Sequence, residues 1–287
     1  MKQVKYQGGN EKTIHTSGLA FSCIAVHCDL DYHTLLIPQM IRKRPKFLIV
    51  VTGFNCAEFV PGCMASINAQ TYNNFEAVFV DDASTDSTWM QITRCRNEKN
   101  ATWEIRKNDK NMGAAFNRYM EIKSRPDDFI ILLMGMDDML FPDALKKISE
   151  YYERGAWMTY GNWIDQHGAG LPADFALHFD EQTHADRSYR EVKYRSTAPN
   201  TFYAHLFKRI PPEDFKLNGE WIDTTTESEV MFSCLEMCGK DRIGVIEEPI
   251  YIYNRNLPGG TQRRLGQDYK NKVYQQIIKR TKRELIA

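Results

Sequence analysis

The sequence has no long apolar run, no excess of charge of either sign and no export signal. No run of apolar residues approaches the roughly 20 that a membrane-spanning helix requires. The chain has 37 Lys+Arg and 37 Asp+Glu, so its formal net charge of +0 indicates no partner. The N-terminus begins polar, with Met1-Lys2-Gln3, rather than with a basic and then an apolar stretch. We therefore expect a soluble cytoplasmic protein.

Cysteine is present, but without the spacing of a disulfide framework or a zinc site. Seven cysteines, an odd number, are spread along 287 residues, a length that needs no disulfide bonds for stability. Cys234 and Cys238 are one helical turn apart, but no C-x-x-C motif or paired histidine accompanies them. We predict reduced thiols, with this pair packed in the core.

Apolar runs that are typical of buried strands alternate with helical stretches from residue 47 onward. The expected strands are 47–51, 77–80, 103–106 and 129–134. The expected helices are 57–69, one capped by residues 84–88 that runs to about 98, and 113–123. This alternation predicts a mostly parallel sheet with helices on both faces, which is an αβα sandwich.

Polar side chains follow three of the expected strands at the point where each strand ends. These residues are Asn55, Asp81, Asp82, Asp137 and Asp138. Parallel sheets bind ligands at the carboxyl ends of their strands, so we expect these side chains to line a pocket. Carboxylates repel a diphosphate unless a divalent cation neutralises them. A nucleotide together with a metal ion is therefore the expected ligand.

Ordered motifs follow the same strands: Phe54-Asn55, the segments 66–76 and 80–86, Asn111-Met112-Gly113, and Asp137-Asp138. In this order they resemble family-2 inverting glycosyltransferases of the GT-A fold, and the similarity extends over roughly residues 47–260. We therefore expect a GT-A-type αβα sandwich with a mostly parallel central sheet, an N-terminal extension and a basic helical C-terminal tail.

The resemblance implies which residues contact the nucleotide-sugar donor. They are Thr52, Phe54, Asn55, Asp81, Asp82, Asn111, Gly113, Arg118 and Arg255. A carboxylate only accepts hydrogen bonds, which suits an imide N–H such as that of uracil, so a UDP-sugar is the expected donor. The proline that usually precedes the Phe-Asn pair in this family is absent, and Thr52-Gly53 stands there instead.

The resemblance also implies a Mn²⁺ or Mg²⁺ ion. The usual pattern is Asp-x-Asp followed by another Asp, and here Gly135 stands in place of the first acid. Asp137 matches the acid that binds the cation, and Asp138 is expected to support it. Capping of a helix that begins near Pro142 is the alternative interpretation of Asp137.

An inverting transferase needs a carboxylate that deprotonates the acceptor hydroxyl. The family places this base in a Glu-Asp pair at the start of a late helix, and the matching segment here is 224–232. One register, counted from Met231, selects Glu229, and the other, counted from Gly239, selects Glu227. We prefer Glu229, because the other register leaves a serine as the base, and Asp223 is a third candidate.

The expected organisation is an extension at 1–46, a glycosyltransferase domain at 47–250, and a lid and basic helix at 251–287. The domain is predicted to divide into a nucleotide-binding half, 47–140, and an acceptor and catalytic half, 141–250. The tail from 263 to 283 carries eight Lys or Arg residues. Two interpretations stay open: a solvated helix, or a contact with a polyanion or an anionic membrane that would make the protein peripheral.

The sequence therefore predicts a metal-dependent inverting glycosyltransferase, of hexosyl or N-acetylhexosaminyl type, acting on an acceptor hydroxyl. The acceptor stays open among a glycan, a polyol polymer, a lipid-linked sugar and a modified nucleic acid. Two alternatives remain. One is a nucleotide-sugar-binding domain without transferase activity, and the other is a sugar nucleotidyltransferase on a similar sheet.

Overall fold

An eight-stranded sheet runs through the protein in the order β3-β2-β1-β4-β7-β6-β10-β5. The computed structural model describes residues 44–166, 178–254 and 261–286. The strands are β1 (Lys46–Gly53), β2 (Phe75–Asp81), β3 (Glu104–Lys107), β4 (Phe129–Gly135), β5 (Met139–Leu140), β6 (Met158–Asp165), β7 (Asn200–Tyr203) and β10 (Ile243–Tyr253). A separate hairpin is formed by β8 (Lys216–Leu217) and β9 (Glu220–Trp221).

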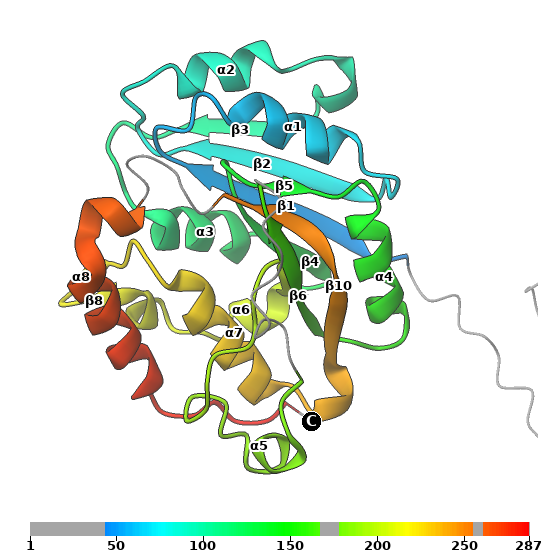
Figure 1. Cartoon of the computed structure of the whole chain (residues 1–287), viewed down its shortest axis with the longest axis vertical. Helices are drawn as coiled ribbons and strands as arrows, with labels where there is room; N and C mark the ends of the chain where they lie inside the picture. The colour runs from blue at the N-terminus through cyan, green and yellow to red at the C-terminus, as the bar shows by residue number, and fades with distance from the viewer. Residues whose placement is uncertain (1–43, 167–177, 255–260, 287) are drawn as a thin grey trace, which may run out of the picture. The chain divides into compact units, whose positions relative to one another are not determined.

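The helices cover both faces of this sheet (Figure 1). They are α1 (Val60–Asn68), α2 (Thr88–Arg94), α3 (Ala114–Lys123), α4 (Ala144–Glu153), α5 (Glu181–Asp186), α6 (Ala204–Phe207), α7 (Thr226–Met237) and α8 (Thr261–Ile278), with short 3₁₀ turns η1 (Glu98–Asn100), η2 (Pro212–Phe215) and η3 (Lys240–Arg242). Within the described ranges, no helix is long and apolar enough to cross a membrane.

The strand directions confirm the predicted mostly parallel αβα sandwich. Strand β1 pairs in parallel with β2 and β4, β2 with β3, and β6 with β10. The antiparallel strand β7 lies between β4 and β6 and joins the two parallel groups. The four expected strands and three expected helices of the first half all form, with bounds that differ by a few residues.

Side-chain alternation along β1 explains why both faces are covered. Leu48 and Val50 pack into one buried cluster with α3, α6 and α7, whereas Phe47, Ile49 and Val51 pack into another with α1, α2 and α4. A strand that is apolar on both faces cannot remain exposed on either, so helices must cover it twice.

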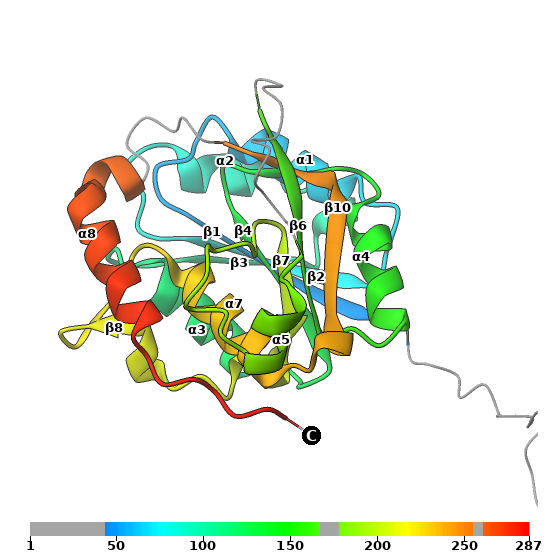
Figure 2. The same cartoon turned by 60° about the horizontal axis from the view of Figure 1, so that its bottom comes forward.

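The described cysteines are free thiols, as predicted, and Cys234 and Cys238 are buried in the core. The described part of the predicted tail consists of α8 and a segment that runs on from it past α7 and α5 (Figure 2). Residues 1–43 lie outside the described residues. The predicted domain boundaries therefore stay predictions.

The end of β1 is the point to which both acidic loops are attached. Thr52 O accepts a hydrogen bond from Met136 N at 3.0 Å, and Gly53 O accepts one from Asp82 N at 2.9 Å. A Cβ atom at Gly53 would lie 2.5 Å from Cβ of Met136. Because a Cβ atom moves only with its backbone, glycine is what permits this close approach.

We expect Gly53→Ala to destabilise the fold by about 1–3 kcal/mol, because the added methyl group forces β1 and the loop after β4 apart. Chemical denaturation measures the change. Gly62→Ala in α1 is the matched control. Its Cβ would meet only the flexible Sδ of Met139 at 3.3 Å, and alanine favours a helix by roughly 0.5–1 kcal/mol. If both substitutions change the free energy of unfolding equally, the close approach of Gly53 to Met136 is not the constraint proposed here.

Candidate active site

The carboxyl ends of β2, β1 and β4 lie side by side in the sheet. Gly53 is in register with Asp81, and Thr52 is in register with Gly135. The loops that carry Asp81-Asp82 and Asp137-Asp138 therefore flank the end of β1. This arrangement brings together two of the acidic pairs that the sequence singled out.

Asp81 and Asp82 have different surroundings although they are adjacent. Asp81 is fully buried, and its Oδ1 accepts a hydrogen bond from Ser84 N at 3.0 Å. Its Oδ2 has no hydrogen-bond partner among the described residues. A buried carboxylate oxygen without a donor is costly, so this atom is the one that a ligand N–H would satisfy.

Both carboxylate oxygens of Asp82 accept hydrogen bonds from the loop that precedes α3. Its Oδ1 accepts from Asn108 Nδ2 at 2.7 Å and from Met112 N at 2.9 Å, and its Oδ2 accepts from Gly113 N at 2.9 Å. Asn111 Nδ2 donates to the backbone oxygen of Asp82 at 3.2 Å. Asp82, Asn111 and Gly113 therefore form one unit that fixes the start of α3.

Phe54 and Asn55 follow β1 directly. Asn55 has a left-handed backbone with φ of 54°, which asparagine tolerates better than most residues. Its Oδ1 accepts from Thr85 N at 2.9 Å, and its own N donates to Ser84 Oγ at 2.9 Å. Asn55 thus ties the end of β1 to the loop after β2.

Asp137 is half-buried at the end of β4, and burial raises its pKa to about 6. Asp138 is buried more deeply, and its oxygens accept hydrogen bonds from Tyr251 OH at 2.6 Å and from Asn254 N at 2.9 Å. Burial, followed by the neighbouring charge of Asp137, raises the pKa of Asp138 well above its usual range.

The space above Gly135 is occupied by these two carboxylates. A Cβ atom at Gly135 would lie 2.6 Å from Asp137 Oδ1 and 2.9 Å from Asp138 Oδ2. The side chains thus occupy the space of the acid that Gly135 replaces. Among the described residues, no group of three or more His, Cys, Asp or Glu side chains is arranged to hold a metal ion.

A cation fits this strand end only if the substrate supplies further ligands. Mg²⁺ is usually bound in proteins by one or two carboxylates together with substrate phosphates and water. Asp138 is committed to Tyr251 and Asn254, which leaves Asp137 as the carboxylate of this pair to face a cation. The residues present therefore fit a metal ion that binds together with a diphosphate.

Glu227 lies in the first turn of α7 and pairs with Arg118 of α3, with 2.6 Å between Arg118 Nη1 and Glu227 Oε1. Arg118 is buried, whereas the side chain of Glu227 is 39% exposed. Burial is the largest single influence and raises the pKa of Glu227, but the charge and hydrogen bond of Arg118, a backbone hydrogen bond and the charge of Lys270 together lower it, so the net effect is a lowered pKa. The charge of Glu227 also contributes to the raised pKa of Asp138. The start of α7 therefore acts electrostatically on the end of β4.

Glu229 is enclosed on a different side of α7. Its side chain has 0% exposure and lies among Arg190, Arg280 and Arg283 at 3.0–3.5 Å. Burial raises its pKa although Arg190 and Arg280 oppose the rise. The predicted preference for Glu229 over Glu227 stays a prediction, and the structure encloses the Glu229 carboxylate whereas that of Glu227 is partly exposed.

Asp223, the third candidate, precedes α7 in the chain and contacts the start of α3, where its Oδ1 accepts a hydrogen bond from Ala114 N at 3.2 Å. Arg255 lies outside the described residues. Tyr251 and Asn254 were not predicted as site residues, because they follow Asp138 by more than 100 positions. A covariation signal between these positions would have found them.

The basic tail uses part of its charge internally. Arg280 and Arg283 pair with Asp214 and with Glu229. Lys282 donates to the backbone oxygen of Asp186 at 2.6 Å. The predicted contact with a polyanion or a membrane therefore loses these side chains as binding groups, and it stays a prediction for the rest of the tail.

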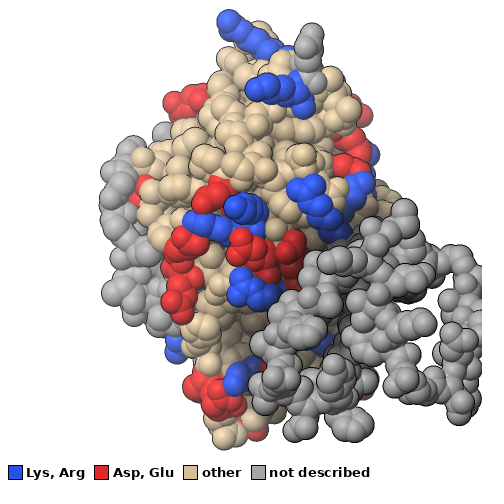
Figure 3. All heavy atoms as spheres, turned by 90° about the vertical axis from the view of Figure 1, so that its right-hand side faces the viewer, with Lys and Arg blue, Asp and Glu red and all other residues tan. Residues whose placement is uncertain are grey.

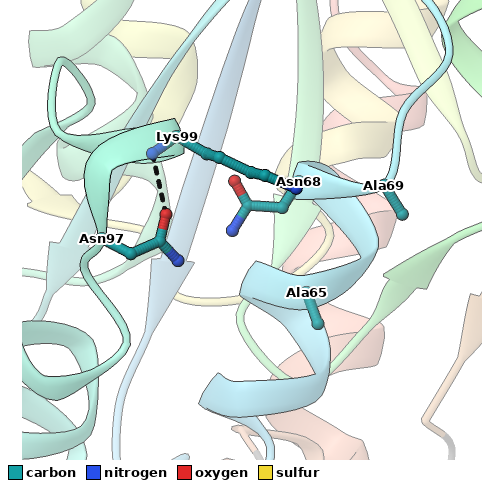
Figure 4. A pocket seen from close by; sticks show the side chains of 5 residues that line it. All are labelled: Ala65, Asn68, Ala69, Asn97 and Lys99. Atoms are coloured by element: carbon teal, nitrogen blue, oxygen red, sulfur yellow. Dashed lines mark hydrogen bonds between the residues drawn. The ribbon is translucent and has the colours of Figure 1, made fainter.

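Two surface features lie outside this site. A hollow of about 580 Å³ is lined by Ala65, Asn68, Ala69, Asn97 and Lys99 (Figure 4). It lies at the C-terminal end of α1, which is the edge of the sheet where β2 begins rather than ends. On the side of α4, charges of both signs are interspersed (Figure 3), and Lys147 there pairs with Asp143 and Glu248.

The comparisons with known proteins agree on one family. The family model described as "Glycosyl transferase family 2" matches residues 48–211, which is more than half of the chain. The *Escherichia coli* protein WfaP, UDP-Glc:alpha-D-GlcNAc-diphosphoundecaprenol beta-1,3-glucosyltransferase, is 26% identical over 115 residues, covering 40% of this chain and 45% of that one. The putative glycosyltransferase EpsH of *Bacillus subtilis* (strain 168) is 21% identical over 238 residues, covering 81% and 66%. The chain thus spans about half to two thirds of these relatives.

Solved structures show the same fold. *Staphylococcus aureus* TarS 1–349 in complex with UDP-GlcNAc is 18% identical with a TM-score of 0.58, covering 74% of this chain and 59% of that one. Glucosyl-3-phosphoglycerate synthase from *Mycobacterium tuberculosis*, in complex with Mn²⁺, UDP and glucosyl-3-phosphoglycerate, is 13% identical with a TM-score of 0.54, covering 81% and 79%.

We expect Asp137→Asn to stabilise the metal-free protein at neutral pH by about 1–3 kcal/mol. Burial raises the pKa of Asp137 in the folded state from its ordinary value of 3.8 to about 6, so ionisation of Asp137 opposes folding above pH 6. The gain should fade as the pH falls from about 6 to 4, because the carboxyl group is then neutral in both states. Thermal unfolding across this pH range measures it.

Tyr251→Phe is the control with the opposite sign, because it leaves a buried oxygen of Asp138 without its donor, at a cost of roughly 1–3 kcal/mol. If Asp137→Asn is less stable than the wild type at pH 7.5, ionisation of Asp137 does not oppose folding as expected here.

Proposed function

The chain belongs to glycosyl transferase family 2, and on this premise we propose that it transfers a sugar from a nucleotide-diphosphate donor to an acceptor hydroxyl. The observation that carries the proposal is the buried Oδ2 of Asp81, which has no hydrogen-bond partner among the described residues. Asp81 ends β2, and only β1 separates this strand from β4, which leads to Asp137. A nucleotide base can supply the missing donor at this position, and its diphosphate can reach Asp137.

We propose a UDP-sugar as the donor. The imide N–H of uracil is a single donor that matches a single acceptor oxygen on Asp81. A charge-assisted hydrogen bond of this kind is roughly twice as strong as a neutral one. The complexes of TarS with UDP-GlcNAc and of glucosyl-3-phosphoglycerate synthase with UDP are consistent with this proposal.

The proposed cofactor is Mn²⁺ or Mg²⁺, held by Asp137 together with the donor diphosphate. When bound, the cation neutralises the negative charge that develops on the departing nucleoside diphosphate. The carboxylate of Asp138 keeps Asp137 in place by anchoring the end of β10 through Tyr251 and Asn254. Arg118 supplies a buried positive charge between this strand end and α7.

We propose that the transfer inverts the anomeric centre and that Glu227 is the base. Its carboxylate is partly exposed, and Arg118 holds it by one oxygen. The second oxygen is then suited to accept the proton of the attacking hydroxyl. This geometry differs from that of Glu229, whose fully buried carboxylate pairs with three arginines. We propose that the transferred group is a hexosyl or N-acetylhexosaminyl residue and that the acceptor is a glycan, a polymer or another molecule with a free hydroxyl.

A nucleotide-sugar-binding domain without transfer is the second candidate. It is favoured by Gly135, whose space is filled by the neighbouring carboxylates, and by Ser228 next to Glu227. Purified protein incubated with a panel of nucleotide sugars and Mn²⁺, with and without EDTA, separates the candidates. Release of nucleoside diphosphate supports transfer. Binding without release, even with acceptors supplied, supports the second candidate, and pyrophosphate release from a nucleoside triphosphate and a sugar phosphate supports nucleotidyl transfer.

We expect Asp81→Asn to weaken UDP binding by about 10- to 150-fold, which corresponds to the loss of a hydrogen bond to a charged group, roughly 1.5–3 kcal/mol. Its thermal stability should change little. Asp82→Asn is the matched variant and should behave in the opposite way, because it disrupts the loop before α3 and lowers stability first. Calorimetry with UDP and Mn²⁺ gives the affinities. Normal binding by a folded Asp81→Asn variant would place the nucleotide elsewhere.

We expect Glu227→Gln to lower the turnover number by about 10²–10⁴-fold, because the amide cannot take the acceptor proton. The affinity for UDP should remain near that of the wild type, since donor binding does not need this group. Asp223→Asn serves as the comparison. If Glu227→Gln keeps full transfer activity and Asp223→Asn loses it, the base is Asp223.

A further inference from the structure

The last described residues form an extended segment, 279–286, which we call the C-terminal strap. Its backbone is fixed at both ends. Arg283 N donates to Glu236 Oε2 at 3.0 Å, and Ile286 N donates to Met237 O at 2.9 Å. Arg187 Nη1 donates to the backbone oxygen of Arg283 at 2.9 Å. The strap therefore lies along the C-terminal half of α7, as Figure 2 shows.

A buried ionic cluster joins the strap to the N-terminal half of α7. Three carboxylates and three guanidinium groups make up the cluster: Glu229, Glu236, Asp214, Arg190, Arg280 and Arg283. The formal charges balance within it. Each side chain of the cluster is less than one fifth exposed. Removal of one charge therefore leaves an opposite charge buried without compensation.

Glu229 is the centre of this cluster. Its Oε2 lies 3.0 Å from Arg280 Nε and 3.5 Å from Arg190 Nη1, and its Oε1 lies 3.5 Å from Arg283 Nη2. Ser233, one turn later on α7, donates to Oε1 at 2.9 Å. Two strap arginines thus converge on a residue in the first turn of α7.

The same turn carries Glu227 on the opposite side of the helix. Residues two positions apart in an α-helix point about 200° away from each other. Glu227 therefore faces Arg118 while Glu229 faces the strap. A rotation or shift of α7 that loosens one contact necessarily displaces the other.

Stability alone gives a weak reason for this cluster. Buried ion pairs are often no more stabilising than apolar side chains of the same size, whereas they do specify one geometry. The apolar core around α7 already buries Val230, Phe232 and Leu235. The cluster adds directional contacts at the one turn that also bears Glu227.

We propose that Glu229, Arg280 and Arg283 are positioning residues: the C-terminal strap sets the rotation of α7 and thereby holds Glu227 against Arg118. The effect on transfer rests on the proposed function. The effect on the conformation of α7 does not, because it follows from contacts within this chain.

The test compares Glu229→Gln, Arg280→Gln and the double variant Glu229→Gln/Arg280→Gln in the full chain. Each single change unbalances the cluster, and the double change restores its charge balance. We expect each single variant to lower the turnover number at least 10-fold, with KM for the donor within about twofold of the wild type. The double variant should recover most of the loss. Lys282→Gln changes the strap outside the cluster and is the control. It should keep the turnover number and the hydrogen-exchange rates of the wild type.

Hydrogen exchange gives the readout that needs no substrate. The amides of Ser228 and Glu229 in the first turn of α7, and those of Arg283 and Ile286 in the strap, should exchange faster in both single variants and slower again in the double variant. If Glu229→Gln does not fold, Arg280→Gln alone carries the comparison, because its side chain lies at the edge of the cluster.

The outcomes separate the two proposals. A wild type that transfers no sugar, with exchange changes as expected, overturns the proposed function and keeps the strap as a device that positions α7. A double variant that recovers neither the turnover number nor the protection from hydrogen exchange overturns the proposal that the strap positions α7. Loss of the acidic limb of the pH–rate profile in Glu229→Gln would show that Glu229 is itself the base, which also overturns the positioning role.

Discussion

The close approach at the end of β1 sets the geometry of the candidate site. The backbone oxygens of Thr52 and Gly53 each hold one acidic loop, and only a residue without a Cβ atom fits against Met136 at this point. Asp81 and Asp137 therefore lie at the ends of the two strands that flank β1. A parallel sheet supplies the common edge, and this contact fixes the two acidic loops to the end of β1.

The acids of this site occur in three pairs, and the members of each pair have different tasks. Asp82, Asp138 and Glu229 are buried and bound by donors from distant segments. Their partners Asp81, Asp137 and Glu227 keep oxygen atoms toward the region in which we propose that the substrates bind. One member of each pair orders the backbone so that the other is held in position, and hydrogen bonds or ion pairs offset the cost of burying its charge.

The first half of the fold was predictable because its signals are local. Apolar runs of strand length, separated by helical stretches, indicate a parallel sheet without any knowledge of tertiary contacts. The division of tasks within each acidic pair was not predictable in this way. Whether Glu227 or Glu229 faces α3 depends on the rotation of α7, which residues 280 and 283 influence from the other end of the chain. Likewise, the donors to Asp138 lie on β10 and just beyond it, far from it in sequence.

The filled space above Gly135 has a consequence for substitutions at this position. The carboxylates of Asp137 and Asp138 lie where a side chain at position 135 would begin, so an acid reintroduced there meets occupied volume and two like charges. An acidic side chain at position 135 would therefore require Asp137 and Asp138 to turn aside, and Asp138 would then give up its hydrogen bond from Tyr251.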